Sequence, residues 1–209
     1  MLEFEYRGGD AVMIAGKKVK LFVDPGSAGA NIKAADLKDA VELLTKSNNA
    51  VTDLEVRLTV DGPGEYEVSN FTILGIGSMG SHIEGEIARN VSTLYRVEHL
   101  GITMAVVGNI TSKLVDEQLE ALSYVDILVM SADDNSSEAL ARYMSMIKDI
   151  EPKLVIPIES HSRGDSSVFE YLVKELSISE ENAIRQPKLK LKAATSVPQV
   201  LTICSLEKH

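Results

Sequence analysis

The sequence predicts an α/β layered sandwich. Short strand-like runs fill the first half of the chain, whereas helical patterns and apolar strands alternate in the second half, from about residue 111. This order is typical of two packed layers of strands with helices outside them. No stretch rich in Pro, Gly or Ser interrupts the pattern, so we expect one domain spanning residues 1–209.

The first half contains several β-like segments. Residues 12–14 and 19–23 are apolar and short, and the second run stops at the turn Asp24-Pro25-Gly26. Residues 54–60 alternate as a strand does, and Asp61-Gly62-Pro63-Gly64 predicts a tight turn after them. Residues 36–44 instead predict a short helix, because Leu37, Val41 and Leu44 recur at helical spacing. Further strands are expected at residues 65–74, 92–97 and 102–107, the first two joined by a glycine-containing loop.

The second half alternates between helices and buried strands. A helix beginning near Thr111 or Ser112 carries Val115, Leu119 and Leu122 on one face. Residues 125–130 and 154–158 are almost wholly apolar, as expected for strands covered on both faces. Helices are predicted around residues 140–147 and at 169–176, and a last strand at residues 200–206.

Charge and cysteine content limit the partners. The formal net charge is −10 and the isoelectric point is near 4.9, which disfavours binding to nucleic acid or to an anionic membrane surface. The single cysteine, Cys204, rules out an intramolecular disulfide, and the chain has neither a signal-peptide start nor an apolar run of membrane-spanning length. We expect a cytoplasmic protein.

One motif offers a nucleotide-cofactor alternative. Gly75, Gly77 and Gly80 satisfy the pattern G-x-G-x-x-G in residues 75–80, after a strand-like run. The pattern binds a pyrophosphate only where a helix opens at the glycines, and Gly85 interrupts the segment that follows. A loop joining two strands is the better interpretation of these glycines.

Five segments, taken in order, resemble the metallo-β-lactamase-fold proteins, in the branch similar to L-ascorbate-6-phosphate lactonase. The most distinctive segment is residues 60–68, Val-Asp-Gly-Pro-Gly-Glu-Tyr-Glu-Val. The others are Val23-Asp24-Pro25, residues 116–128 with their D-E-Q-L-E-A-L and V-D-I-L pieces, residues 151–157 ending in V-I-P, and K-L-K-L at residues 188–191. The resemblance covers most of the chain and implies a four-layer αββα sandwich.

The resemblance also implies a metal centre, and the ligand positions can be checked. The family holds metal with an H-x-H-x-D-H loop that follows a strand ending here at Thr45, but Lys46, Asn48, Ala50 and Val51 occupy those four positions. The later aspartate corresponds to Asn109 and the last histidine to Glu159. Ala and Val carry no donor atom and a lysine ammonium repels a cation, so we expect no metal cofactor.

Other polar residues leave a second interpretation open. His82, Glu159, His161 and Asp24 could gather zinc or manganese at a displaced site, and Arg89 resembles a family residue beside the pocket. The sequence therefore leaves three hypotheses. The first is a degenerate, non-hydrolytic member with a binding or assembly role, either with an unknown small-molecule or protein ligand or as a homo-oligomer. The second is a metal-dependent hydrolase with a displaced site, and the third, weaker one is a nucleotide-cofactor binder.

Overall fold

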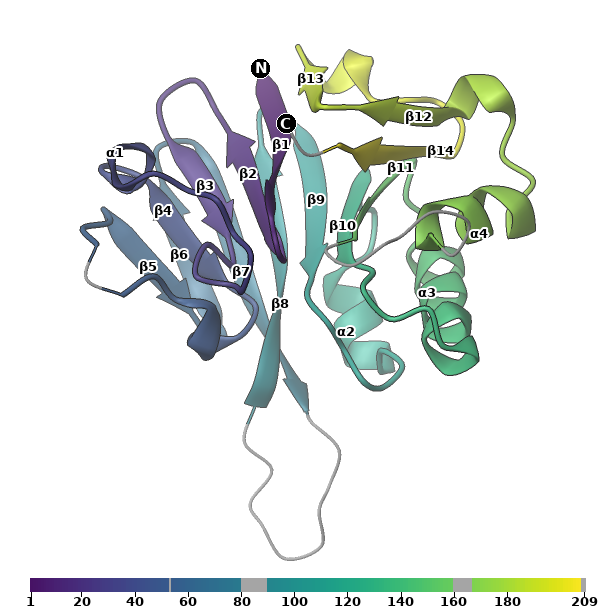
Figure 1. Ribbon diagram of the computed structural model, residues 1–209, viewed down its shortest axis with the longest axis horizontal. Helices are drawn as coiled ribbons and strands as arrows, with labels where there is room; N and C mark the ends of the chain where they lie inside the picture. The colour runs from purple at the N-terminus through teal and green to yellow at the C-terminus, as the bar shows by residue number, and fades with distance from the viewer. Residues whose placement is uncertain (53, 80–89, 160–166, 208–209) are drawn as a thin grey trace, which may run out of the picture.

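Two β-sheets stacked face to face form the centre of the molecule (Figure 1). The computed structural model describes residues 1–52, 54–79, 90–159 and 167–207. Within them the first sheet has the strand order β13-β1-β2-β3-β4-β5 and the second the order β12-β14-β11-β10-β9-β8-β7-β6. The first sheet consists of β1 (Leu2–Gly8), β2 (Ala11–Ala15), β3 (Lys20–Val23), β4 (Val41–Leu44), β5 (Leu58–Asp61) and β13 (Lys188–Leu191). The second consists of β6 (Gly64–Val68), β7 (Phe71–Met79), β8 (Asn90–His99), β9 (Ile102–Val107), β10 (Ile127–Ser131), β11 (Leu154–Ile158), β12 (Ala183–Gln186) and β14 (Thr202–Leu206).

Helices cover the outer faces of the two sheets very unequally. The second sheet carries α2 (Asp116–Ala121), α3 (Ser137–Ile150) and α4 (Val168–Glu175), which pack on it through an apolar cluster that includes Tyr143, Ile147 and Leu172. Among the described residues, the first sheet carries only the single turn α1 (Ala34–Leu37), seated on Met13 and Phe22. The αββα prediction is confirmed, with one helical layer reduced to a turn. No helix in the described ranges is long and apolar enough to cross a membrane.

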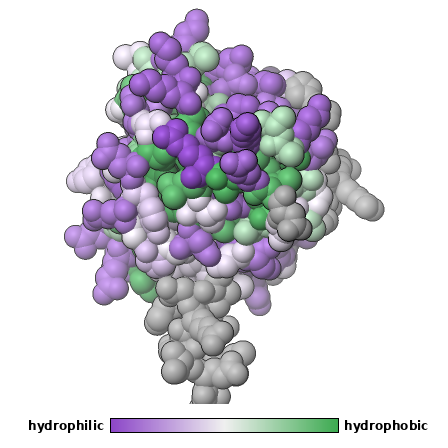
Figure 2. Space-filling view, turned by 90° about the vertical axis from the view of Figure 1, so that its left-hand side faces the viewer, coloured by the Kyte–Doolittle hydropathy of each residue, from purple (hydrophilic) through white to green (hydrophobic). Residues whose placement is uncertain are grey.

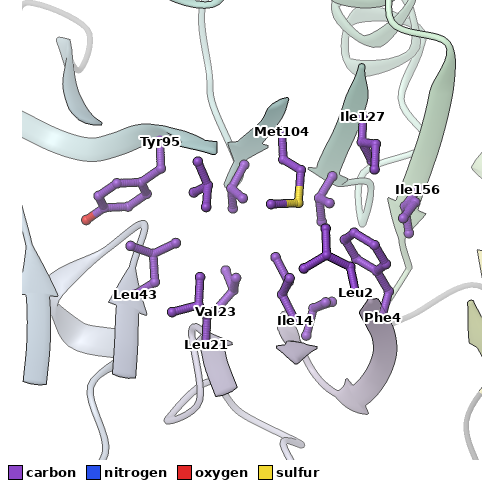
Figure 3. Close-up of a cluster of buried hydrophobic side chains, with 14 of the residues drawn as sticks. Leu2, Phe4, Ile14, Leu21, Val23, Leu43, Tyr95, Met104, Ile127 and Ile156 are labelled. Atoms are coloured by element: carbon purple, nitrogen blue, oxygen red, sulfur yellow. The ribbon is translucent and has the colours of Figure 1, made fainter. Parts of the chain in front are cut away.

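The core between the sheets is made by alternate residues of each strand. Leu2, Phe4 and Ile14 from the first sheet face Met104 and Ile156 from the second (Figure 3). All five side chains are at most 1% exposed. Strand geometry explains the selection, because successive side chains point to opposite faces. Tyr95 in β8 adds a polar link, since its hydroxyl donates to Leu44 O (2.6 Å) across the core and also lies 3.2 Å from Val60 O.

Ion pairs rather than helices cover much of the outer face of the first sheet. Lys188 on β13 lies 2.9 Å from Glu5 on β1, and Glu5 accepts from Arg7 at 2.9 Å. Arg7 continues to Asp36 in α1 at 3.3 Å, and Lys20 on β3 reaches the same carboxylate at 3.1 Å. These ion pairs tie Asp36 of α1 to the first sheet, beside the apolar contact that Leu37 makes with Met13 and Phe22.

The chain passes from one sheet to the other at the predicted turn. Asp61 ends β5 and Gly64 begins β6, so the turn at residues 61–64 joins strands of different sheets and the prediction of a turn is confirmed. Gly62 adopts φ +98°, a conformation that favours glycine. Figure 2 faces this edge of the sandwich and shows hydrophobic side chains in its middle, framed by hydrophilic ones. Leu58 and Tyr66, on the two edge strands, are only partly buried against the core.

Four sequence-based predictions of local structure were wrong. The helix expected to begin near Thr111 or Ser112 is α2, which begins at Asp116, so Val115 precedes the helix and is 56% exposed instead of lying on its apolar face. The helix predicted at residues 36–44 is the turn α1 followed by strand β4, because Val41 and Leu43 face the core between the sheets. The strand predicted at residues 65–74 is two strands, β6 and β7, which turn at Ser69 and Asn70 with φ of 52° and 92°. The loop expected at the glycine motif is strand as far as Met79, paired with β8; Gly80 lies outside the described residues.

Candidate functional site

Several strands end together at one end of the sandwich. Strands β3 and β4 run parallel in the first sheet, and β9, β10 and β11 run parallel in the second. The carboxyl ends of such strands are where α/β folds place ligands. Asp24, Thr45 and Glu159 follow such strands directly, and Asn109 is the second residue after β9.

Asp24 organises the loop that follows β4. Its Oδ1 accepts from Thr45 N at 2.9 Å, and its Oδ2 accepts from the Thr45 hydroxyl at 2.5 Å. The side chain is almost fully buried, and burial raises its pKa to about 6 although bonds from Thr45, Asn49 and the Lys46 backbone oppose the rise. Both oxygens therefore bind the loop, and Asp24 acts as its anchor.

The loop itself presents few donor atoms for a metal. Lys46 is half-buried, and Asn48 in the 3₁₀ turn η1 (Ser47–Asn49) is exposed. Ala50 packs by its backbone against Gly26, where an added Cβ would lie 2.1 Å from Ala50 O. Val51 points to the outer apolar cluster of the first sheet, and its N–H donates to buried Glu42 at 2.6 Å. The positions that correspond to the family's ligands thus serve local packing.

A pair of carboxyl groups lies near this loop that the sequence did not single out together. Asp10, in the β1–β2 turn, shares a hydrogen bond with Asp133, which follows β10. Burial, that bond and the charges of Asp133 and Asp24 raise the pKa of Asp10 to about 7, whereas the Lys46 ammonium lowers it. The Ser131 hydroxyl also lies 3.5 Å from Asp10 Oδ1. The carboxyl of Asp10 is therefore partly protonated near neutral pH.

Tyr6 borders the carboxyl pair. Its hydroxyl donates to Gly9 O at 3.0 Å. Burial, followed by the charges of Asp133, Asp10 and Glu159, raises its pKa to about 12, so it stays protonated. Tyr6 thus links the carboxyl pair electrostatically to Glu159 on the neighbouring strand end.

Glu159 caps a helix. One oxygen accepts from Phe169 N at 2.7 Å and the other from Val168 N at 3.2 Å, the first two residues of α4. The first N–H groups of a helix have no partner within the helix, and a carboxylate there is stabilised by the helix dipole. The residue at the family's last histidine position therefore holds α4 to the end of β11.

Asn109 is half-buried after β9, beside a close approach of the two sheets. A Cβ added to its neighbour Gly108 would lie 2.2 Å from Thr45 Oγ1, and Thr45 O accepts from Thr93 N at 2.8 Å. The loop after β4 is therefore pressed against the second sheet. His82, Arg89 and His161 lie outside the described residues.

The glycine motif has a packing explanation. A Cβ added to Gly75 would lie 2.4 Å from Gly62 O in the turn between β5 and β6. Residues 75–79 continue β7, and no helix opens there. The described part of the motif therefore lacks the helix N-terminus that binds a pyrophosphate.

The donor set of the described residues does not fit the family's metal. Among them no group of three or more His, Cys, Asp or Glu is arranged to hold an ion. The described imidazole, His99, ends β8 at the opposite end of the sandwich. Zinc sites in proteins use three or four such side chains, so the described residues alone provide no centre of that kind.

Comparisons with known proteins identify the family. The model of the family described as "Beta-lactamase superfamily domain" matches residues 3–159, which confirms the predicted superfamily. A candidate Zn-dependent hydrolase of the metallo-β-lactamase superfamily from Thermotoga maritima is 16% identical, with 99% of each chain covered and a TM-score of 0.72. A candidate metal-dependent hydrolase from Parabacteroides distasonis is 15% identical over 85% of this chain and 90% of its own, with a TM-score of 0.57.

A third structure extends the comparison. The metallo-β-lactamase-fold protein YhfI from Bacillus subtilis is 10% identical over 99% of this chain and 96% of its own, with a TM-score of 0.60. No curated protein sequence matches this chain significantly. Structural similarity at sequence identities this low shows the fold, and the activity has to be inferred from the residues of the site.

Proposed function

Because this chain belongs to the Beta-lactamase superfamily domain family, we propose that it is a degenerate member that binds a ligand, or assembles, without metal-dependent hydrolysis. The observation that carries the proposal is the loop after β4, where Lys46, Asn48, Ala50 and Val51 stand at the four ligand positions. A protonated ammonium has no lone pair, alanine and valine have no donor atom, and an amide oxygen is weaker than a carboxylate.

The carboxylates that remain near the loop have other partners. Asp24 accepts from Thr45, and Glu159 accepts from Val168 and Phe169 at the start of α4. Drawing either group to a metal ion would weaken contacts that hold the loop or the helix. This competition supports a structural role for both carboxylates.

Lys46 supports the same proposal electrostatically. Its ammonium lowers the pKa of Asp10, so it stabilises the ionised form of a carboxyl that has Asp133 and Asp24 as neighbours. We propose that this charge takes over part of the role of the cation in the rest of the family. Lys46→Gln should then raise the pKa of Asp10, which a carbon-13 NMR titration of the aspartate carboxyls would measure; an unchanged pKa would remove the charge-replacement idea.

The charge of the strand-end residues limits the ligand. Four carboxyl groups, those of Asp10, Asp24, Asp133 and Glu159, accompany the ammonium of Lys46 at this end of the sandwich. A surface of this sign disfavours phosphates and nucleic acids and favours neutral or cationic groups that donate hydrogen bonds. The lone cysteine, which is buried, is compatible with a reducing compartment, and we place the protein in the cytoplasm.

A metal-dependent hydrolase with a displaced site is the second candidate. Glu159 follows β11 directly, at the end of the sandwich where the family binds metal, and precedes residues 160–166, which include His161. His82 would supply another imidazole, and such a set suits zinc or manganese. Because His82 and His161 lie outside the described residues, metal content is the measurement that separates the two candidates.

The experiment measures metals and turnover together. Protein purified without chelator or added metal is analysed by inductively coupled plasma mass spectrometry, then assayed with a phosphodiester, a lactone and a β-lactam. We expect the metal content to be well below one ion per chain. We also expect no turnover that a chelator abolishes, because water without a Lewis acid keeps a pKa of about 15.7. Stoichiometric metal that is lost in Glu159→Gln, and kept in the exposed control Glu67→Gln, would establish the displaced site instead.

A further inference from the structure

The first sheet ends in an uncovered strand. Strand β5 is the last in the order of that sheet, and among the described residues it pairs with β4 on one side only. Arg57, Thr59 and Asp61 are exposed along it, and Leu58 is only partly buried. Figure 2 faces this edge and shows the hydrophobic side chains there, framed by hydrophilic ones. An uncovered edge strand is a template on which another strand can pair.

The backbone groups of β5 that point outward can be identified from its neighbour β4. Leu43 O accepts from Asp24 N at 3.0 Å, so Leu43 turns its backbone toward β3. Backbone groups alternate in direction along a strand, so the residues on either side of Leu43 turn toward β5. In the register of the two strands, those residues bond alternate residues of β5 and leave Thr59 and Asp61 with their N–H and C=O groups directed to the open edge.

A second copy of β5 fits this edge in one register. Antiparallel pairing centred on Thr59 sets Thr59 opposite itself and Arg57 opposite Asp61 of the second copy. The outward N–H groups of Thr59 and Asp61 then donate to C=O groups of the other strand. A slide in one direction would set Glu55 opposite Asp61, and a slide in the other would set Arg57 opposite Pro63, which has no N–H to donate.

The charges along β5 are self-complementary in this register. No ion pair joins Arg57 to another described residue. Asp61 Oδ1 accepts from the Ser47 hydroxyl at 2.9 Å, which leaves Oδ2 for a guanidinium of the second copy. Opposite charges directly across a pair of strands are favourable, and the two-fold arrangement makes this contact twice.

The other edges of the two sheets lack this match. Self-pairing of β6 about its central residue would set Glu65 opposite Glu67, and self-pairing of β13 would set Lys188 opposite Lys190. Like charges directly across strands are destabilising. The charge in β12, Arg185, already forms an ion pair with a residue of α4. Among the described edges, β5 is therefore the one whose charges attract a second copy.

From the outward backbone groups, the register and the charges, we propose that two copies of this chain pair through β5. The two first sheets then form one continuous sheet, and Leu58 of each copy lies against Val60 of the other on the core side. A pair of short strands makes a small interface, so the dissociation constant should lie between about 1 µM and about 100 µM. The inference rests on the assembly role in the proposed function; metal content tests the loss of hydrolysis, whereas the association state tests the interface.

The first test measures association of the native chain. Sedimentation velocity at concentrations on both sides of that range should show a shift from the 22.7 kDa of the chain toward twice that mass. Over the same series, hydrogen exchange followed by NMR should slow for the Thr59 and Asp61 amides and stay unchanged for Val60, whose backbone faces β4. A chain that remains monomeric, or a dimer in which the Thr59 and Asp61 amides are not protected, would overturn the proposal.

The second test reverses one charge at a time. Arg57→Asp should weaken the dimer by about tenfold to a hundredfold, because two cross-strand contacts change from attraction to repulsion, and Asp61→Arg should do the same. An equimolar mixture of the two variants should form heterodimers with about the native affinity, because every paired position again holds opposite charges.

The matched control for the change in net charge is Lys148→Asp, at an exposed position of α3, which should associate as the native chain does. Circular dichroism establishes that each variant is folded. A mixture that associates no more tightly than its two components alone would show that the register is wrong and the proposal with it. If either variant does not fold, the exchange pattern of the native chain decides the same question.

Discussion

The hydroxyl of Tyr95 gives a sharp test of how the two sheets are held together. Tyr95 is fully buried, and its hydroxyl crosses from β8 to donate to Leu44 O at 2.6 Å. Tyr95→Phe keeps the ring and its apolar contacts, so it opens no large cavity. It removes a hydrogen bond and leaves a buried carbonyl with one partner fewer.

The expected loss follows from that single change. Leaving a buried acceptor unpaired costs about 1–3 kcal/mol, so we expect the free energy of unfolding to fall by about 2 kcal/mol. For a chain of this size, 1 kcal/mol corresponds to about 2–4 °C, which predicts a melting temperature lower by about 4–8 °C. Burial raises the pKa of Tyr95, so its hydroxyl stays protonated and the loss should not depend on pH near neutrality.

Urea unfolding followed by far-ultraviolet circular dichroism measures the effect. The matched control is Tyr124→Phe, because Tyr124 is 92% exposed and should change stability by less than about 0.5 kcal/mol. A shifted midpoint with an unchanged slope would identify the loss as one of folded-state stability. If Tyr95→Phe is as stable as Tyr124→Phe, the hydroxyl does not hold the two sheets together and the reasoning fails.

Three further predictions concern Asp10, Glu159 and Gly75. The pKa of Asp10 is raised from 3.8 to about 7, so the folded state binds more protons than the unfolded state between these values and loses stability as the pH rises. After discounting for solvent screening, the stability of Asp10→Asn relative to the native protein should increase by about 1 kcal/mol from pH 4 to pH 8 in urea unfolding, and a stability difference that does not change with pH would contradict this. Glu159→Ala should cost about 1–2 kcal/mol in the same assay by uncapping α4, against no measurable change for exposed Glu67→Ala. Gly75→Ala should cost about 1–3 kcal/mol because its Cβ would meet Gly62 O, and a thermal melt matching the native one would refute that contact.

The buried strands of the second sheet were predictable because both of their faces are covered. Residues 125–130 and 154–158 are continuous apolar runs, and they match β10 and β11 within two residues. The prediction of a helix at residues 36–44 was wrong because the spacing of Leu37, Val41 and Leu44 fits a helix as well as it fits a turn followed by a strand. Strand β1 was not predicted, although Leu2, Phe4 and Tyr6 alternate with charged residues as a half-buried strand requires.

The candidate site at the strand ends was harder to predict than the fold. The family resemblance located the loop after β4, and Asp24 and Glu159 do lie at strand ends. The Asp10–Asp133 pair could not be found from spacing, because only the packing of the two sheets brings these residues together. The capping role of Glu159 has the same origin, since its partners begin a helix whose position depends on tertiary structure.

Very short connections join the two sheets at both edges of the sandwich. Gly62 and Pro63 join β5 to β6 at one edge, and Pro187 alone joins β12 to β13 at the other. Because the sheets are connected along both edges, they cannot separate to let a ligand in between them without disrupting the edge strands. A ligand that reaches the space between the two sheets therefore enters at an end of the sandwich and not along these edges.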